Sequence, residues 1–131
     1  MADQGFAGRT ATAMLPAKDI ARARKWYEEK LGITPKDTGD YGSGYDLGGL
    51  RVYLYTSDFA GTAKHTLITF DCDDLLADMK AMRAKGVKFI DYDLPDLKTE
   101  NGVASFGDTV KNAWCEDSEG NILGFVEGMS G

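Results

Sequence analysis

Apolar residues recur along the first half of the chain with two different periods. One run has the spacing of a helix face, three or four positions apart, and consists of Ile20, Ala23, Tyr27 and Leu31. Asp19 is a good N-cap for this helix and Gly32 a good stop. The pattern therefore predicts an amphipathic helix over 19–31.

Strand patterns surround this helix. A short run at 10–15 and a weaker one at 34–38 are suited to strands. Two alternating runs follow, over 41–47 and 50–54, and Gly48-Gly49 between them is typical of a hairpin turn. The predicted order of the first half is β-α-β-β-β.

The second half repeats this order. A strand at 65–70 precedes a helix that Asp73 or Asp74 caps and Gly86 ends, and the distance from Asp73 to Gly86 equals that from Asp19 to Gly32. Strands are predicted at 87–92, 110–116 and 122–127, with Asn101-Gly102 and 117–121 as turns. The chain is therefore interpreted as two copies of one βαβββ unit.

This duplication predicts an α+β fold. One helix covers only one face of each module's sheet, so the open faces can curve into a mixed sheet with a concave cleft of the kind that binds small ligands. We expect a single domain over 10–128, with module 1 at 10–56, a linker at 57–64 and module 2 at 65–128. Residues 1–9 read as a flexible leader.

Composition and charge exclude several classes of function. A chain of 131 residues fits one domain, and a net charge of −6 disfavours nucleic-acid binding. No apolar run is long enough to span a membrane, and the first ten residues lack the pattern of a secretory signal. We expect a cytoplasmic protein whose thiols, Cys72 and Cys115, stay reduced.

Two segments give the chain a resemblance to a known family. The stretch from Leu15 through Trp26-Tyr27 to Leu31-Gly32, and the turn Asp117-Ser-Glu-Gly-Asn121, resemble the vicinal oxygen chelate superfamily. That superfamily includes glyoxalase I, extradiol dioxygenases, fosfomycin-resistance enzymes and bleomycin-binding proteins. The resemblance covers about 10–128, and it implies the duplicated fold and a homodimer whose modules form the ligand clefts.

The resemblance also implies where a metal would be held. Metal-using members carry a His, a Glu, a His and a Glu on four strands, and counting from Asp19, Gly49 and Gly120 places Thr12, Tyr53, His65 and Gly124 at these positions. Only His65 is a ligand of the family type, whereas a divalent cation needs three or four converging His or carboxylate ligands. We therefore expect no metal and no other cofactor.

The remaining candidates are residues that could line a cleft. The hydroxyls of Thr12 and Tyr53 suit a polar ligand, and aromatic side chains large enough to wall a flat ligand occur at Tyr55, Phe106 and Trp114, with Tyr41 and Tyr45. For any one of these rings, plain core packing is the simpler interpretation. His65 could bond a ligand, act as a general base, or be an ordinary histidine at the edge of the core.

These observations favour a metal-free protein that binds a small molecule in an aromatic cleft, similar to the antibiotic-sequestering branch, rather than an enzyme. One alternative is a metal-dependent lyase or dioxygenase of the glyoxalase type with a degenerate site, in which His65 is the catalytic residue. Another is a structural or regulatory module that only dimerises. The sequence predicts no nucleic-acid or membrane partner.

Overall fold

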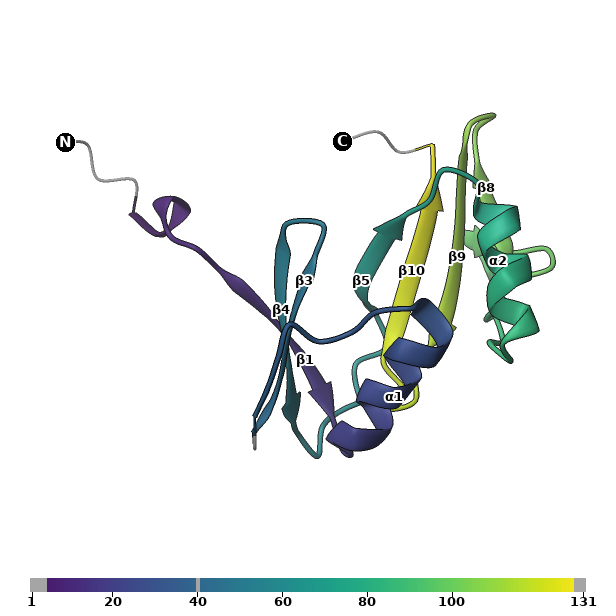
Figure 1. Ribbon diagram of the computed structural model, residues 1–131. Helices are drawn as coiled ribbons and strands as arrows, with labels where there is room; N and C mark the ends of the chain where they lie inside the picture. The colour runs from purple at the N-terminus through teal and green to yellow at the C-terminus, as the bar shows by residue number, and fades with distance from the viewer. Residues whose placement is uncertain (1–4, 40, 129–131) are drawn as a thin grey trace.

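The computed structural model describes residues 5–39 and 41–128, and it contains two four-stranded mixed sheets and two helices (Figure 1). The first sheet has the order β1-β4-β3-β2 and the second the order β5-β10-β9-β8. In each sheet the first strand of the module pairs in parallel with the last, and the other pairs are antiparallel. The predicted α+β architecture of two βαβββ modules is confirmed.

The first module follows the predicted order. Its elements are β1 (Thr12–Ala17), α1 (Ile20–Leu31), β2 (Asp37–Gly39), β3 (Gly42–Leu47) and β4 (Leu50–Thr56). Asp19 caps α1 by accepting a hydrogen bond from the backbone N–H of Arg22, and Gly32 ends the helix in a left-handed conformation. Gly48 and Gly49 both have positive φ, as the tight hairpin requires.

The first strand lies later than predicted. The prediction placed it at 10–15, whereas β1 continues through Pro16 to Ala17. The edge position explains this, because β1 pairs only with β4 and a proline on an edge strand removes no sheet hydrogen bond on its free side.

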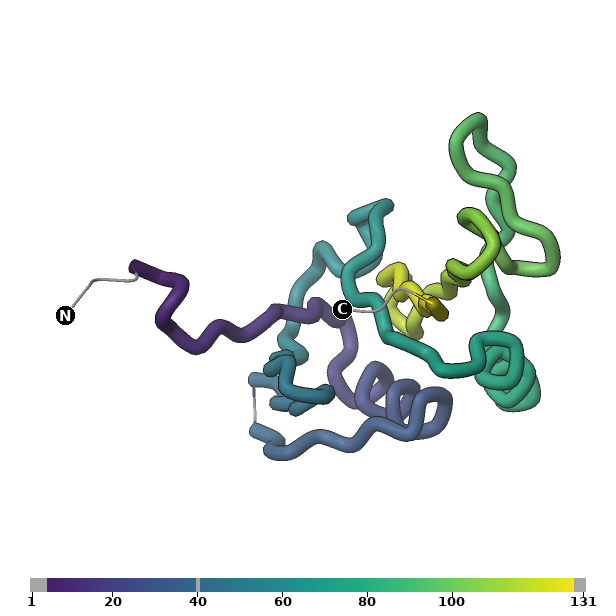
Figure 2. The backbone as a smooth tube through the Cα atoms, turned by 90° about the horizontal axis from the view of Figure 1, so that it is seen from above, coloured from purple at the N-terminus to yellow at the C-terminus, as the bar shows by residue number. Residues whose placement is uncertain are grey.

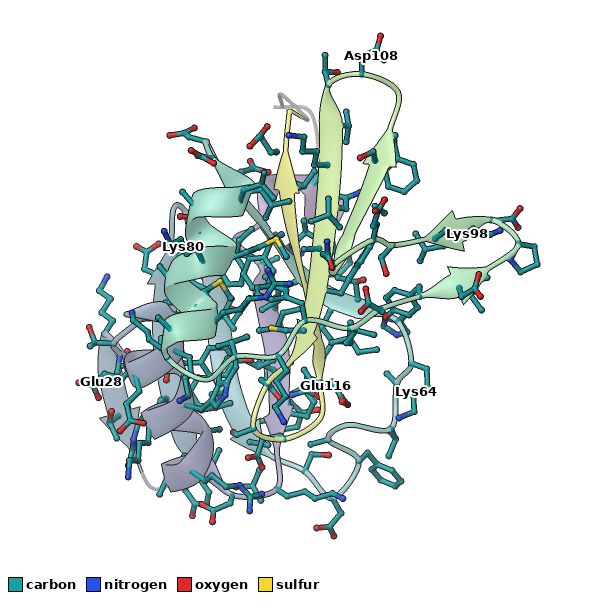
Figure 3. The ribbon with its side chains drawn as sticks, turned by 90° about the vertical axis from the view of Figure 1, so that its right-hand side faces the viewer. Glu28, Lys64, Lys80, Lys98, Asp108 and Glu116 are labelled. Carbon is teal, nitrogen blue, oxygen red and sulfur yellow. The ribbon has the colours of Figure 1, made fainter. Side chains whose placement is uncertain are left out.

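The second module agrees with the prediction at its two ends and differs in the middle. Its strands and helix are β5 (Thr66–Asp71), α2 (Leu75–Ala84), β8 (Val103–Phe106), β9 (Val110–Glu116) and β10 (Ile122–Glu127). The strand predicted at 87–92 is wrong: this stretch forms one isolated bridge, Phe89 with Cys115. Two short strands, β6 (Asp93–Leu94) and β7 (Leu97–Lys98), instead form a hairpin that projects beyond the sheet around the labelled Lys98 (Figure 3).

The beginning of the described chain stands apart from the sheets. A short 3-10 helix, η1 (Gly5–Gly8), precedes β1, and the residues from Gly5 to Met14 are exposed. The tube seen from above shows this segment leading away from both modules (Figure 2). The predicted leader includes this segment, and its residues 1–4 lie outside the described part.

A single apolar core joins the two modules. α1 packs against β3 and β4, and α2 packs against β9 and β10. The buried cluster contains side chains from both halves, among them Leu54, Leu75, Met79 and Leu123, each 1% exposed or less. Cys115 lies in this cluster, and both cysteines are free thiols.

The turn between β9 and β10 joins the second module to α1. Glu119 Oε1 accepts hydrogen bonds from the backbone N–H groups of Lys18 and Asp19, both at 2.9 Å, and the guanidinium of Arg22 contacts both oxygens of the carboxylate. The Glu119 side chain is fully buried, whereas that of Arg22 is 54% exposed. The hydrogen bond from Arg22 is the main reason why the pKa of Glu119 falls to about 2.

Replacing this carboxylate should remove part of the acid sensitivity of the fold. A depressed pKa stabilises the folded state above the ordinary pKa of glutamate, near 4.5, and this stabilisation disappears as the pH falls toward 2. We expect Glu119→Gln to lower the free energy of unfolding by about 2 to 3 kcal/mol at pH 7, and the difference from the parent protein to shrink steadily between pH 4.5 and 2.

Urea unfolding followed by circular dichroism at several pH values measures this effect. Glu29→Gln is the control, because Glu29 is exposed and, within the described residues, its ion pair is the 3.9 Å surface contact with Lys25. Stability curves for Glu119→Gln and the parent that stay parallel from pH 7 to pH 2 would contradict the role given to Glu119.

Candidate ligand-binding site

The face of the first sheet that α1 leaves uncovered carries three of the predicted site residues, Thr12, Tyr53 and Tyr55. Along β4, Val52 and Leu54 are buried beneath α1, and the alternate residues Arg51, Tyr53 and Tyr55 point to the opposite face. Tyr53 lies beside Met14 of β1 and Gly44 of β3 in the sheet register. This open face is where the duplicated fold was expected to hold a ligand.

Thr12 and Tyr53 line one hollow of about 330 Å³ on this side of the sheet. Its wall also carries four charged side chains, Lys36, Asp37, Asp46 and Arg51. The Oδ1 atom of Asp37 lies only 2.8 Å from where a Cβ on Gly44 would be, so a glycine at this point lets the carboxylate lie over the sheet. The hollow therefore combines a phenol ring with both signs of charge.

The charged residues of this hollow were missed by the sequence analysis. Asp46 and Arg51 are direct neighbours across β3 and β4, on either side of the Gly48-Gly49 turn. The hairpin register, once taken from that turn, places both on the same face as Tyr53. The alternation of the strands was thus a usable signal for these two, whereas Lys36 and Asp37 come from a segment without periodicity.

The open side of the second sheet carries Trp114. This residue lies in β9 between the buried Ala113 and Cys115, so its half-buried indole points away from the core. The ring of Tyr92 meets it edge to face, with the centroids 5.4 Å apart. Trp114 and Tyr92 therefore form a ring pair on this sheet that the sequence did not predict.

The other predicted residues are dispersed. Tyr55 is half-buried and lies two residues beyond Tyr53 on the same face. Phe106 ends the edge strand β8 and is 44% exposed. His65 is exposed just before β5, and its Nδ1 lies 3.1 Å from the carbonyl oxygen of the adjacent Thr66. The structure brings Thr12 and Tyr53 together, and it gives His65 no partner among the other predicted site residues.

A side chain at Gly124 would be crowded by its neighbours. It lies in β10 next to Trp114 of β9 and Thr69 of β5. A Cβ built on Gly124 would be 3.0 Å from Thr69 Oγ1, 3.1 Å from Thr66 Cγ2 and 3.5 Å from Trp114 Nε1. A carboxylate ligand at this fourth position would have to displace the side chains of Thr66 and Thr69 by a few tenths of an ångström.

A metal centre of the family type does not fit these residues. Of the four positions, Thr12 and Tyr53 offer only hydroxyls and Gly124 offers nothing, which leaves His65 as a single imidazole. The nearest acid on β10, Glu127, accepts a hydrogen bond from the backbone N–H of Leu75 at 2.8 Å and so caps α2. Within residues 5–39 and 41–128 no group of three or more His, Cys, Asp or Glu side chains gathers as a metal site would require.

The two thiols do not form a nucleophilic site. Burial raises the pKa of both Cys72 and Cys115 to about 12, so both are protonated at neutral pH. Cys115 is completely buried in the core. Neither cysteine has a recorded contact with His65 that would activate it.

A second, larger hollow of about 700 Å³ lies on the side of the helices, and it contains none of the predicted site residues. It runs between the β3–β4 hairpin, the end of β5 and α2.

In the described part of the chain, no helix is long and apolar enough to cross a membrane.

Comparison with known proteins identifies the family. The sequence model of the Glyoxalase/Bleomycin resistance protein/Dioxygenase superfamily matches residues 9–125, so the chain belongs to this superfamily. It is the vicinal oxygen chelate group that the sequence resembles. A search of curated proteins finds no match.

Solved structures show the same fold at low sequence identity. A glyoxalase/bleomycin resistance protein/dioxygenase from Alicyclobacillus acidocaldarius is 17% identical, with a TM-score of 0.69 over 94% of this chain and 93% of its own. The fosfomycin resistance protein FosX from Listeria monocytogenes is 10% identical, with a TM-score of 0.71 over 91% and 92%. A glyoxalase/bleomycin resistance protein from Catenulispora acidiphila is 20% identical, with a TM-score of 0.65 over 90% and 96%.

Adding a side chain at position 124 should destabilise the protein. We expect Gly124→Ala to cost about 1 to 3 kcal/mol in the free energy of unfolding, because the new Cβ meets Thr66 and Thr69. Thr69→Ala removes one of the two neighbours, so the double variant should recover part of that loss. Urea unfolding of the four proteins gives the coupling between the two positions.

Gly39→Ala provides the matched control, since Gly39 also lies in a strand but has no atom within 4 Å of its added Cβ. This substitution should change the stability by no more than about 0.5 kcal/mol. If Gly124→Ala and Gly39→Ala have the same effect, the position beside Trp114 has room for a side chain after all.

Proposed function

We propose that this protein binds a small molecule without a metal ion, in a cleft formed by the open faces of its sheets, as a sequestering protein does. The observation that carries the proposal is the hollow beside Tyr53 and Thr12. At Gly124, which corresponds to the fourth metal position of the family, neighbouring side chains lie close to where a ligand side chain would begin. The hollow can therefore hold a ligand, whereas the four metal positions of the family supply a single metal-binding side chain here, His65.

The side chains in the hollow suggest the chemistry of the ligand. Tyr53 offers a ring face, while Arg51 and Lys36 can pair with an anionic edge and Asp37 and Asp46 with donors. A volume of about 330 Å³ is at the lower end for a drug-sized ligand. A flat molecule with polar or charged edges therefore fits this surface better than a purely apolar one.

We further propose that the working unit is a homodimer. Trp114 and Tyr92 lie on the second sheet and line no part of the hollow beside Tyr53. Both β1 and β5 are edge strands, and Met14 on β1 is 53% exposed. A second copy would complete the cleft by facing one sheet with the other, in keeping with the family resemblance.

We also place the protein in the reducing cytoplasm, where Cys72 and Cys115 stay free.

A calorimetric screen with bleomycin, flat aromatic antibiotics and thiol conjugates tests the proposal. We expect one of these probes to bind, and Tyr53→Ala to weaken that binding by about tenfold or more, because the ring contact is lost. Tyr41→Ala is the matched control, since Tyr41 is 84% exposed and outside the hollow.

The same titrations distinguish the proposed function from an enzyme. Binding should be unchanged by EDTA and by His65→Ala, because His65 lies outside the hollow. Tight stoichiometric uptake of Ni, Zn, Mn or Fe(II), or loss of probe binding with EDTA, would overturn the proposal in favour of a metal-dependent protein. A panel in which no probe binds would also count against it.

A further inference from the structure

The two modules present hairpin turns of unequal length to each other's helix. The turn 117–121 of the second module lies against α1, where the Tyr27 hydroxyl donates to Asp117 Oδ2 at 2.5 Å and Glu119 accepts from the backbone before the helix. The corresponding turn of the first module contains only Gly48 and Gly49. It has no side chain to place against α2.

The groove of about 700 Å³ lies where the longer turn would lie if the modules were identical. It is bounded by the β3–β4 hairpin on one side and by β5 and α2 on the other. Met82, which lines the groove, is the residue of α2 that corresponds to Tyr27 of α1 when the caps Asp19 and Asp74 are aligned. Its hydrocarbon wall comes from Leu31, Ile33, Leu47, Phe70, Met82 and Phe125. The duplication therefore leaves an apolar seat beside α2 that the short turn does not fill.

The two ends of this groove carry opposite charges. Asp71 and Asp78 line it at the beginning of α2, and Lys30 and Lys85 line it near the end of that helix. Asp78 and Lys85 are seven residues apart, which corresponds to about 10 Å along a helix. In Figure 3, α2, on which Lys80 is labelled, lies above α1, on which Glu28 is labelled.

Neither carboxylate at the acidic end has an ion pair among the described residues, and the Asp78 carboxylate interacts with the thiol of Cys72. The Lys30 ammonium donates to the backbone carbonyl of Lys85, so this cation is already engaged at the end of α2. The ion pairs recorded among residues 5–39 and 41–128 join Arg22 to Glu119 and Lys25 to Glu29, and neither includes Asp71 or Asp78.

The thiol of Cys72 lines the groove together with these two carboxylates, and its pKa is raised. Burial is the main reason for the raised pKa of Cys72, the hydrogen bond with the Asp78 carboxylate is the next, and the negative charges of Asp78, Asp71 and Glu127 raise it further. This end of the groove is therefore a region of negative potential next to an apolar wall.

We propose that the groove beside α2 binds a cationic amphiphile, with an ammonium group at Asp71 and Asp78 and a hydrocarbon body along Phe70, Met82 and Leu47. The polarity is opposite to that at α1, where Arg22 receives the acidic turn of the other module. The site shares no residue with the hollow beside Tyr53. It is thus a second binding site, independent of the proposed sequestering cleft.

Calorimetry with octylamine, octanoate and octanol, all below the concentrations at which they aggregate, tests this proposal on the whole protein. Octylamine should bind saturably, and at least about tenfold more tightly than octanoate or octanol, because only the amine can pair with the two carboxylates. Asp78→Asn should weaken octylamine binding by about tenfold. Asp73→Asn, which changes an exposed acid of the same segment outside the groove, should leave it unchanged.

A second variant tests the location without removing charge. Ala81 is exposed and lines the groove, so Ala81→Trp should fill the groove and abolish octylamine binding while the fold persists. Ala84→Trp, on the same helix but outside the groove, is the control for the bulk of the indole.

The remaining outcomes overturn the proposal. Octanoate binding as tightly as octylamine would assign the site to the lysine end, and octylamine binding that survives Ala81→Trp would place the amine elsewhere. Octylamine binding that is lost in Tyr53→Ala would place it in the sequestering cleft. Failure of the antibiotic panel leaves the octylamine result unaffected, so the two proposals fail separately.

Discussion

The buried carboxylate of Asp117 is the interaction on which the arrangement of the two modules depends. It accepts hydrogen bonds from the Tyr27 hydroxyl, from the backbone N–H groups of Glu119 and Asn121, and from the Asn121 side chain. Burial raises the pKa of Asp117, and these donors oppose the shift. A carboxylate buried this deeply is tolerated only where donors surround it, so the turn 117–121 has one stable seat, against α1.

This seat determines which faces of the sheets stay open. With the turn fixed, the Asn121 side chain also donates to the Pro16 carbonyl, so the carboxyl end of β1 is tied to the second module. The helices and the joined core then lie on one side of each sheet. Among the described residues, no helix of the same module covers the faces that carry Tyr53 and Trp114, so residues of the open face and residues of the core alternate along β4 and β9.

The sequence predicted the parts of the fold that local rules control. The cap Asp19, the Gly48-Gly49 hairpin and the strands β9 and β10 follow from periodicity and turn chemistry. For the second helix the sequence offered Asp73 or Asp74, and the structure has Asp74 as the cap. The stretch 87–92 was predicted wrongly, because its residues have strand propensity but the isolated Phe89–Cys115 bridge is the only ladder contact the sheet gives them. In the site, counting from Asp19 and Gly49 selected Thr12 and Tyr53, and in the structure both residues line one hollow. The crowding at Gly124 arises from packing between three strands, which no single-strand pattern encodes.

The differences between the two modules matter more for function than their similarity. A duplicated unit begins with two equal seats for two equal turns, and here the longer turn fills one seat with buried acid while a pair of glycines leaves the other apolar and open. The same asymmetry separates the open faces: one carries a hollow with charged walls beside Tyr53, and the other a ring pair packed over a glycine. Because each difference is confined to a turn or a strand face, the shared core tolerates it, and one fold can present several unlike surfaces to ligands.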